Sequence, residues 1–308
     1  KAVLLVLPHS LPLLPDKNTG RKSLIHRRCE NLTAAFWGEF ERTLPNLNSA
    51  TTIETSLRNA AVGLPILLST IGLGVSIAGI FITRLLKNLP PARVLRAALI
   101  VPPFLAVAAG FVVLPMFGIS TIALVPLGAG VLGGAVVGLV TDYYTSMGPI
   151  RQIAISSLTG PGTNVIRGLA VGMESCAIPL VTLCIVGHYS AEALGLYGIA
   201  LSAVGMLSGT AIVMTIDAYG PITDNGGGIS EMSGLGPEVR KITDELDSVG
   251  NTTAAVGKGF AIGSAVLTVV ALFAAFNMEV NHSRAAQGLG PLSLNLLDAD
   301  VLMGILFG

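Results

Sequence analysis

The sequence has few of the residues that cover the surface of a water-soluble protein. Charged residues make up only 12% of the chain, whereas hydrophobic residues make up 52%. The 18 basic and 18 acidic residues balance to zero net charge, so the composition indicates no surface for nucleic acid. One tryptophan, 37 glycines and a mean hydropathy of +0.74 are instead typical of a polytopic helical membrane protein.

Cysteine and histidine are also scarce, which excludes two kinds of structural site. The three cysteines, Cys29, Cys176 and Cys184, show neither a disulfide framework nor the spacing of metal ligands. The last two share one apolar segment, where cysteine is expected to be a small packing residue. The four histidines are scattered along the chain and suggest no metal triad.

Long apolar runs begin after residue 60. Each full run approaches or exceeds the roughly 20 residues that a helix needs to cross a bilayer. Six full runs and a truncated seventh lie at 61–83, 97–117, 119–141, 164–187, 193–216, 257–276 and 300–308. Lipid offers no partners for open strand edges, so these runs are expected to be helices. The predicted fold is an all-α polytopic membrane protein with about six full transmembrane helices.

Residues 1–60 do not share this character and receive no assignment. Residues 1–15 are apolar, but three prolines interrupt them and they are too short to span a bilayer. Residues 16–60 are polar and include a basic cluster at 21–28. Because the first residue is Lys1 rather than Met, the chain is interpreted as part of a longer one.

The connecting segments predict an orientation. Helices that alternate in direction place the predicted loops 84–96, 142–163 and 217–256 on one side of the membrane, and 217–256 is the predicted catalytic loop. These segments carry seven basic residues: Arg84, Lys87, Arg93, Arg96, Arg151, Arg240 and Lys241. The opposite connections carry only Arg284, so positive-inside bias makes the first set cytoplasmic. The same alternation puts residues 1–60 outside with eight basic residues, which conflicts with that rule.

Acidic residues gather in one of these cytoplasmic segments. Seven of the eighteen lie between residues 217 and 247: Asp217, Asp224, Glu231, Glu238, Asp244, Glu245 and Asp247. Carboxylates between two membrane-length apolar runs are costly in lipid, so they indicate a water-filled functional site. The seven-residue spacing of the first four also fits a solvated helix face, which is the alternative for Glu231 and Glu238.

Asp224 is the most specific candidate for a metal ligand. It precedes Gly226–Gly228, where glycines would leave backbone N–H groups open in a loop. Mg²⁺ prefers one or two carboxylates together with waters and substrate phosphates, and Asn251 would complete such a site. Asn251 is placed at the start of the next helix, so an N-cap is the competing interpretation.

Two charges fall inside an apolar run. Arg167 and Glu174 lie seven residues apart, so on a helix they share a face and either pair or line a water path. Glu174 is therefore a candidate for ion transport. Tyr143 and Tyr144 follow Asp142 at a helix end and are interpreted as interfacial anchors.

Four motifs resemble the membrane-integral, ion-pumping inorganic pyrophosphatases. They are D-A-Y-G-P-I-T-D-N at 217–225, G-N-T-T-A-A-V-G-K-G at 250–259, T-D-Y-Y-T-S at 141–146 and T-N-V-I-R-G-L-A-V-G-M-E-S at 163–175. The resemblance covers about residues 62–308, which would correspond to the seventh to thirteenth helices of that family. It implies hydrolysis of Mg²⁺–pyrophosphate at a cytoplasmic site, outward movement of H⁺ or Na⁺, and a homodimer.

The resemblance also assigns expected roles to residues. Asp224 and Asn251 match positions that contact Mg²⁺–pyrophosphate, while Asp217, Asp244, Asp247 and Lys258 match motif positions near that site. K⁺-independent members carry Lys and Thr where this chain has Ala254 and Gly257, so it resembles the K⁺-dependent class. An ammonium group can replace a bound monovalent cation, whereas alanine leaves space for K⁺.

The family's first and last catalytic motifs are absent from these residues, so this chain alone is expected to be inactive. Two other interpretations stay open. The carboxylates would bind only the transported ion in a secondary transporter or channel, or the chain would be a remnant without activity. The pumped ion is not specified, because the helix that determines it is not among these residues.

Overall fold

The computed structural model describes residues 51–86, 88–117, 119–292, 299, 301 and 303–304. Residues 1–50, including the basic cluster at 21–28, and Lys87 therefore lie outside the described residues. So does most of the expected truncated helix at 300–308. The chain divides into one compact unit of residues 63–268 and a second unit formed by the residues at both ends.

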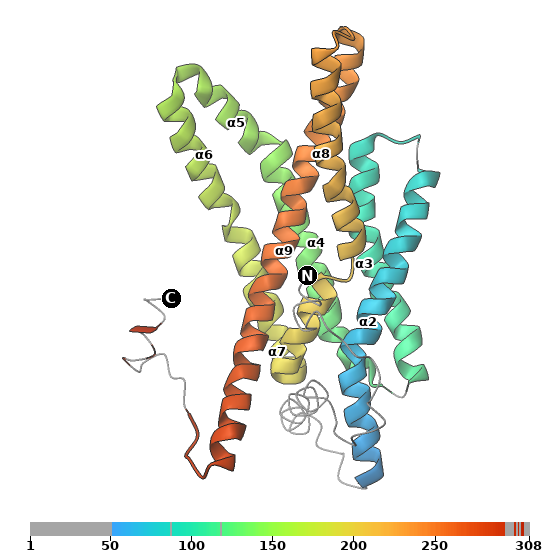
Figure 1. The fold of residues 1–308 in the computed structure, drawn as a ribbon, viewed down its shortest axis with the longest axis vertical. Coiled ribbons are helices and arrows are strands. Elements are labelled where there is room, and N and C mark those ends of the chain that lie inside the picture. Colours follow the sequence, from blue (N-terminus) through green and yellow to red (C-terminus); the bar gives the residue numbers. More distant parts are fainter. Residues whose placement is uncertain are drawn as a thin grey trace, which may run out of the picture. The chain divides into compact units, whose positions relative to one another are not determined.

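Every regular element in the described residues is helical, which confirms the all-α fold. The elements are α2 Thr51–Leu85, α3 Pro91–Met116, η1 Thr121–Ala123, α4 Leu124–Ser146, α5 Gly148–Ser156, η2 Ser157–Thr159, α6 Pro161–Ser175, α7 Ala177–Met206, α8 Thr210–Met232 and α9 Pro237–Ala286. Within the unit of residues 63–268, α2, α3 and α4 run alternately up and down (Figure 1).

Five helical stretches in the described residues, not six, are long and apolar enough to cross a membrane. They are Val62–Leu85, Arg96–Met116, Thr121–Thr159, Pro161–Met206 and Pro237–Ala286. The predicted run 193–216 is not one helix, because α7 ends at Met206 and α8 begins at Thr210. Within α7 the chain also leaves helical geometry at Leu194 and Gly195, where Gly195 has a φ of 58°. This left-handed conformation favours glycine.

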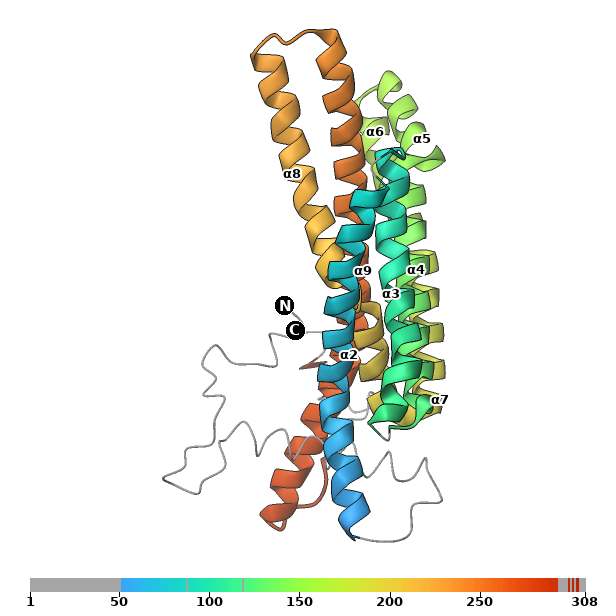
Figure 2. The same cartoon turned by 90° about the vertical axis from the view of Figure 1, so that its right-hand side faces the viewer.

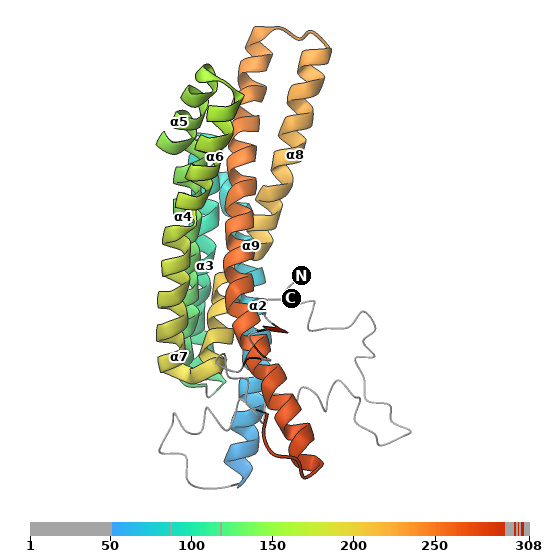
Figure 3. The same cartoon turned by 90° about the vertical axis from the view of Figure 1, so that its left-hand side faces the viewer.

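Close helix packing in the main unit depends on glycines. α4 and the second half of α7 approach so closely that a Cβ on Gly130 would collide with the backbone oxygen of Ser202. A Cβ on Gly205 would likewise collide with the backbone oxygen of Leu127. Small residues at such crossings allow the backbone contact that drives helix association in membranes. Figure 3 shows α4 and α7 beside one another.

The buried core of this unit lies where α9 crosses α4. The Phe260 ring packs over Gly134 and Gly138, and a Cβ on either glycine would lie within 3 Å of that ring. Val137, Val256 and Phe260 belong to one buried apolar cluster. This packing holds the middle of α9 against α4.

By contrast, Cys176 and Cys184 are exposed, so their expected role as packing residues is wrong in this part of the chain.

The predicted loops 142–163 and 217–256 are wrong, because both are mostly helical. α8 continues to Met232, and a short turn with Gly234 and Gly236 at positive φ leads into α9. α9 begins at Pro237, and proline is favoured in the first turn because it has no N–H to leave unpaired. Gly226–Gly228 lie inside α8, so their backbones form a helix rather than an open loop (Figure 2).

Candidate metal and phosphate site

The close crossing of α8 and α9 positions the candidate site. A Cβ on Gly250 would lie 2.7 Å from Thr223 Oγ1 and 2.8 Å from Gly220 Cα. The two helices therefore touch through backbone, and Thr223 is buried at this crossing. This contact holds α9 in place against α8. The residues of α9 around Gly250 then line a pocket together with residues of α4 and α5.

An open pocket of about 470 Å³ lies between the end of α4, α5 and this face of α9. Its lining residues are Thr145, Ile150, Asp244, Asp247, Ser248, Asn251 and Thr252. Asp244, Asp247 and Asn251, at spacings of three and four, share one face of the helix. Three residues that the sequence singled out are thus brought together. Thr145, from T-D-Y-Y-T-S, was not predicted, although its motif was recognised.

Asp247 is the carboxylate of this pocket that has one buried oxygen without a partner among the described residues. The Asn251 amide Nδ2 donates a hydrogen bond to Asp247 Oδ2 at 3.2 Å. Asp247 Oδ1 is buried and has no hydrogen-bond partner among the described residues. A buried acceptor without a donor is unfavourable. This oxygen is therefore positioned for a ligand that supplies positive charge.

Asp244 differs because a neighbouring cation already contacts it. Arg240 Nη2 lies 3.2 Å from Asp244 Oδ1, and Arg240 Nη1 lies 2.5 Å from Glu231 Oε2. The guanidinium thus bridges the end of α8 to α9. Exposed ion pairs of this kind contribute little stability, but they do reduce the negative charge of Asp244.

These oxygen donors fit Mg²⁺. Asp247 Oδ1 and the Asn251 amide oxygen are hard ligands, and Asp244 lines the same pocket. No group of three or more His, Cys, Asp and Glu side chains with metal geometry occurs in the described part of the chain. A site with few protein ligands suits Mg²⁺, which keeps several water ligands and takes others from a substrate phosphate.

The interpretation of Asn251 as an N-cap is wrong. Asn251 lies well inside α9, which begins at Pro237, and its amide contacts the side chain one turn earlier. The helix starts with Pro237 and Glu238, a proline and an acidic residue that suit a first turn, so it begins before the apolar run rather than with it. Asn251 is therefore available as a ligand or as a positioning residue for Asp247.

Asp217 and Gly257 form a second juxtaposition, between α8 and α9. A Cβ on Gly257 would lie 3.7 Å from Asp217 Oδ1, so the two candidate positions face each other. Asp217 and Ala254 are both half-buried, and Ala254 lies one turn before Gly257 on the same face of α9. Burial also raises the pKa of the nearby Tyr219 hydroxyl above its ordinary value. The Asp217 carboxylate therefore faces a small residue of α9 rather than a basic side chain at position 257.

Asp224 and Lys258 are both exposed and line neither described pocket. Asp224 follows the buried Thr223 on α8, and Thr223 lies at the crossing with Gly250, the residue before Asn251. The roles of Asp224 and Lys258 stay predictions.

Glu174 makes a contact that the sequence did not indicate. Tyr144 Oη donates a hydrogen bond to Glu174 Oε1 at 3.0 Å, which joins α4 to α6. Arg167 contacts Gln152 instead, so the first of the two alternatives, a pairing of Arg167 with Glu174, does not occur in this structure. The transport role of Glu174 stays a prediction.

The comparisons with known proteins agree with these motifs. Residues 35–308 match the family described as inorganic H⁺ pyrophosphatase, a match that begins within the unassigned segment 1–60. A Clostridium tetani protein named putative K(+)-stimulated pyrophosphate-energized sodium pump is 42% identical over 282 residues, covering 87% of this chain and 40% of that protein. A Thermotoga maritima K(+)-stimulated pyrophosphate-energized sodium pump is 40% identical over 268 residues, covering 81% and 37%.

A Methanosarcina mazei K(+)-insensitive pyrophosphate-energized proton pump is 47% identical over 190 residues, covering 58% of this chain and 27% of that protein. The chain therefore spans less than half the length of these curated relatives. Relatives with and without potassium stimulation, and with either pumped ion, are all similar to it. Because the family match covers most of the sequence, this chain belongs to the inorganic H⁺ pyrophosphatase family.

Proposed function

We propose that the longer protein containing this chain is a pyrophosphate-energised pump for H⁺ or Na⁺, and that α9 supplies part of its hydrolytic site. The observation that carries the proposal is Asp247, whose buried Oδ1 is unpaired in a pocket shared with Asp244 and Asn251. The names of the relatives supply the substrate and the transported ions. The secondary transporter and the remnant are the alternatives to be tested.

The residues of this site divide the work between binding and positioning. Bound Mg²⁺ would offset phosphate charge and make the phosphorus more susceptible to attack by water. Asp247 presents an oxygen for that ion, and Asn251 orients the carboxylate through its 3.2 Å hydrogen bond. Arg240 limits the repulsion that Asp244 would exert on an approaching anion.

The described lining of the pocket contains carboxylates, an amide and hydroxyls, but no lysine or arginine. Pyrophosphate carries several negative charges, so its binding needs cations at the site. We expect the rest of the longer protein to supply further metal ligands and basic side chains. The chain of 308 residues alone is therefore expected to be inactive.

The site is proposed to face the cytoplasm. In the unit of residues 63–268, the α2–α3 connection, α5 and the α8–α9 turn lie at the same end (Figure 1). Arg84, Arg93, Arg151, Arg240 and Lys241 belong to this end. Positive-inside bias makes it the cytoplasmic end. A lipid-embedded homodimer is proposed as the assembly, on the basis of family membership.

Potassium is proposed as a second activating cation. Ala254 and Gly257 leave the space beside Asp217 free of a side-chain cation. The same feature is expected from the resemblance to K⁺-dependent members, and two of the relatives are named as K⁺-stimulated.

The test is pyrophosphate hydrolysis by membranes that contain the longest reading frame with this chain, with Mg²⁺ and with or without K⁺. Asp247→Asn is expected to lower activity by roughly 100-fold or more, because it removes a charged metal ligand. Glu238→Gln is the matched control, since Glu238 lies on α9 but is exposed and outside the pocket. Asp224→Asn tests the separate prediction for that residue.

Activity that requires Mg²⁺ and is lost only in the pocket variants would support the proposal. An absence of hydrolysis in well-folded full-length protein would instead leave the transporter or the remnant. Equal activity of Asp247→Asn and wild type would remove α9 from the hydrolytic site.

A further inference from the structure

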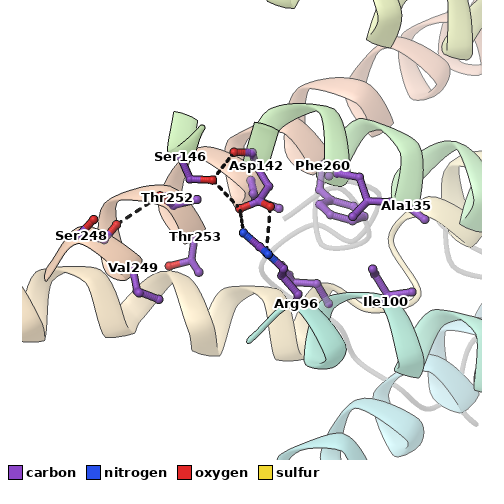
Figure 4. A pocket seen from close by; sticks show the side chains of 14 residues that line it. Arg96, Ile100, Ala135, Asp142, Ser146, Ser248, Val249, Thr252, Thr253 and Phe260 are labelled. Atoms are coloured by element: carbon purple, nitrogen blue, oxygen red, sulfur yellow. Dashed lines mark hydrogen bonds and ion pairs between the residues drawn. The ribbon is translucent and has the colours of Figure 1, made fainter. Parts of the chain in front are cut away.

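An ion pair between a buried carboxylate and a half-exposed guanidinium lies next to the candidate site. Asp142 belongs to the T-D-Y-Y-T-S motif near the end of α4 and is only 8% exposed. Its Oδ2 lies 2.9 Å from Arg96 Nε, and its Oδ1 accepts a hydrogen bond from Arg96 Nη2 at 3.3 Å. Figure 4 shows the guanidinium of α3 meeting this carboxylate, so the pair joins two helices.

Ser146 strengthens the same arrangement within α4. Its hydroxyl contacts the Asp142 backbone oxygen at 2.6 Å and Oδ1 at 3.3 Å. The last turn of α4 is thereby tied to the carboxylate. Removal of the Arg96 charge would leave the Asp142 carboxylate unpaired in a buried place, which is strongly unfavourable. Removal of the Asp142 charge would leave a half-exposed guanidinium without its partner.

The pair borders a small cavity of about 100 Å³ between α3, α4 and α9. That volume would accommodate about three water molecules. On its α9 side the cavity is lined by Ser248, Thr252 and Thr253, with Phe260 at one end (Figure 4).

Ser248 and Thr252 also line the larger pocket that contains Asp247 and Asn251. The turn of α9 from Ser248 to Thr252 therefore lies between the cavity beside the ion pair and the pocket of the proposed metal ligands. On the opposite wall, Thr145 lines the larger pocket and lies three residues after Asp142. Both walls of the site are thus adjacent to the Arg96–Asp142 pair.

We propose that Arg96 and Asp142 are positioning residues for the metal site. The pair holds the end of α4 at a fixed distance from α3, and so it fixes the wall against which α9 places Asp247 and Asn251. This inference rests on the proposed function, because the metal is the one required there. It assigns a role to T-D-Y-Y-T-S, which the proposed function leaves without one.

The experiment measures binding of Mn²⁺, as a probe for Mg²⁺, by electron paramagnetic resonance of the purified full-length protein without pyrophosphate. Asp142→Asn and Arg96→Gln are each expected to weaken the Asp247-dependent Mn²⁺ site about 10-fold, as for other residues that orient metal ligands. The Asp142→Asn, Arg96→Gln double variant retains a hydrogen-bonding amide pair without an unpaired charge. It is expected to bind within about threefold of wild type.

Arg93→Gln is the matched control, because it removes an exposed positive charge from the same helix. In hydrolysis assays the single variants should raise the Mg²⁺ concentration for half-maximal activity while kcat changes less than about twofold. A purely structural defect would instead lower the yield of folded protein or kcat and leave the Mg²⁺ dependence unchanged.

Wild-type Mn²⁺ affinity in both single variants would overturn the proposal, as would a double variant no better than either single one. If the single variants fail to fold, the Mn²⁺ affinity of the double variant tests the proposal. A loss of Mn²⁺ affinity larger than 10-fold in the double variant would contradict the positioning role of the pair. Protein that binds Mn²⁺ through Asp247 but does not hydrolyse pyrophosphate would contradict the proposed function, and the Mn²⁺ measurements would still decide the role of the pair.

Discussion

At the scale of single residues, identical side chains have different roles because their partners differ. Asp244 lies beside the Arg240 guanidinium, whereas Asp247 has a buried oxygen without a partner. Asp142 is buried and paired with Arg96, and Asp224 is exposed. The sequence grouped most of these acids as one cluster, and their contacts distinguish the proposed metal ligand Asp247 from the proposed positioning residue Asp142.

Ala254→Lys is predicted to abolish potassium stimulation in the full-length protein. The lysine ammonium would occupy the space near Asp217 that K⁺ is proposed to fill, so activity without K⁺ should rise to about the K⁺-stimulated level. Hydrolysis rates measured against K⁺ concentration check this outcome.

Ala254→Leu is the control, because it fills similar space without charge and should lower activity with or without K⁺. If Ala254→Lys kept the full response to K⁺, the cation would bind elsewhere.

At the scale of the elements, glycines determine which helices touch. α4 approaches α7 through Gly130 and Gly205, and it accepts the Phe260 ring of α9 over Gly134 and Gly138. The chain contains 37 glycines, but that composition does not specify which helices contact one another. The predicted loop 217–256 is mostly helical, because α8 and α9 extend beyond their apolar runs. As a result, the candidate site is a helix face rather than a loop.

Gly130→Ala is predicted to lower Tm in detergent, because the new Cβ would collide with the Ser202 backbone and force α4 from α7. Overpacking of this kind typically costs about 1–3 kcal/mol. Gly128→Ala is the matched control on the same helix, since a Cβ there meets nothing within 4 Å.

The control should leave Tm unchanged or raise it, because alanine is about 1 kcal/mol better than glycine in a helix. Thermal unfolding of the full-length protein makes the comparison. Equal Tm values for the two variants would show that the α4–α7 contact is not rigid.

At the scale of the molecule, the arrangement of the connections supports one orientation. The α2–α3 connection, α5 and the α8–α9 turn share one end of the unit of residues 63–268 (Figure 1). The connection before η1 lies at the other end. The chain covers 40% of its Clostridium tetani relative, so residues outside it are expected to complete the site.

An impermeant maleimide is predicted to label Ser157→Cys only from the cytoplasmic side and Ser120→Cys only from the opposite side. Both serines are exposed, and they lie at opposite ends of the main unit. The measurement compares intact cells with inverted vesicles, in a variant whose native cysteines are replaced by serine. Reversed labelling of both positions would place the candidate site outside the cytoplasm.

The sequence by itself determined the all-α membrane fold and the family. Long apolar runs leave a helix as the only element that satisfies its backbone in lipid, and the motifs are long and ordered. The motif resemblance also singled out Asp244, Asp247 and Asn251, and the structure places these three residues on one helix face. Only the tertiary structure decided that α4 contacts α7 through Gly130 and Gly205, and that Arg96 pairs with Asp142. Those features depend on contacts between residues far apart in the chain, which no local pattern specifies.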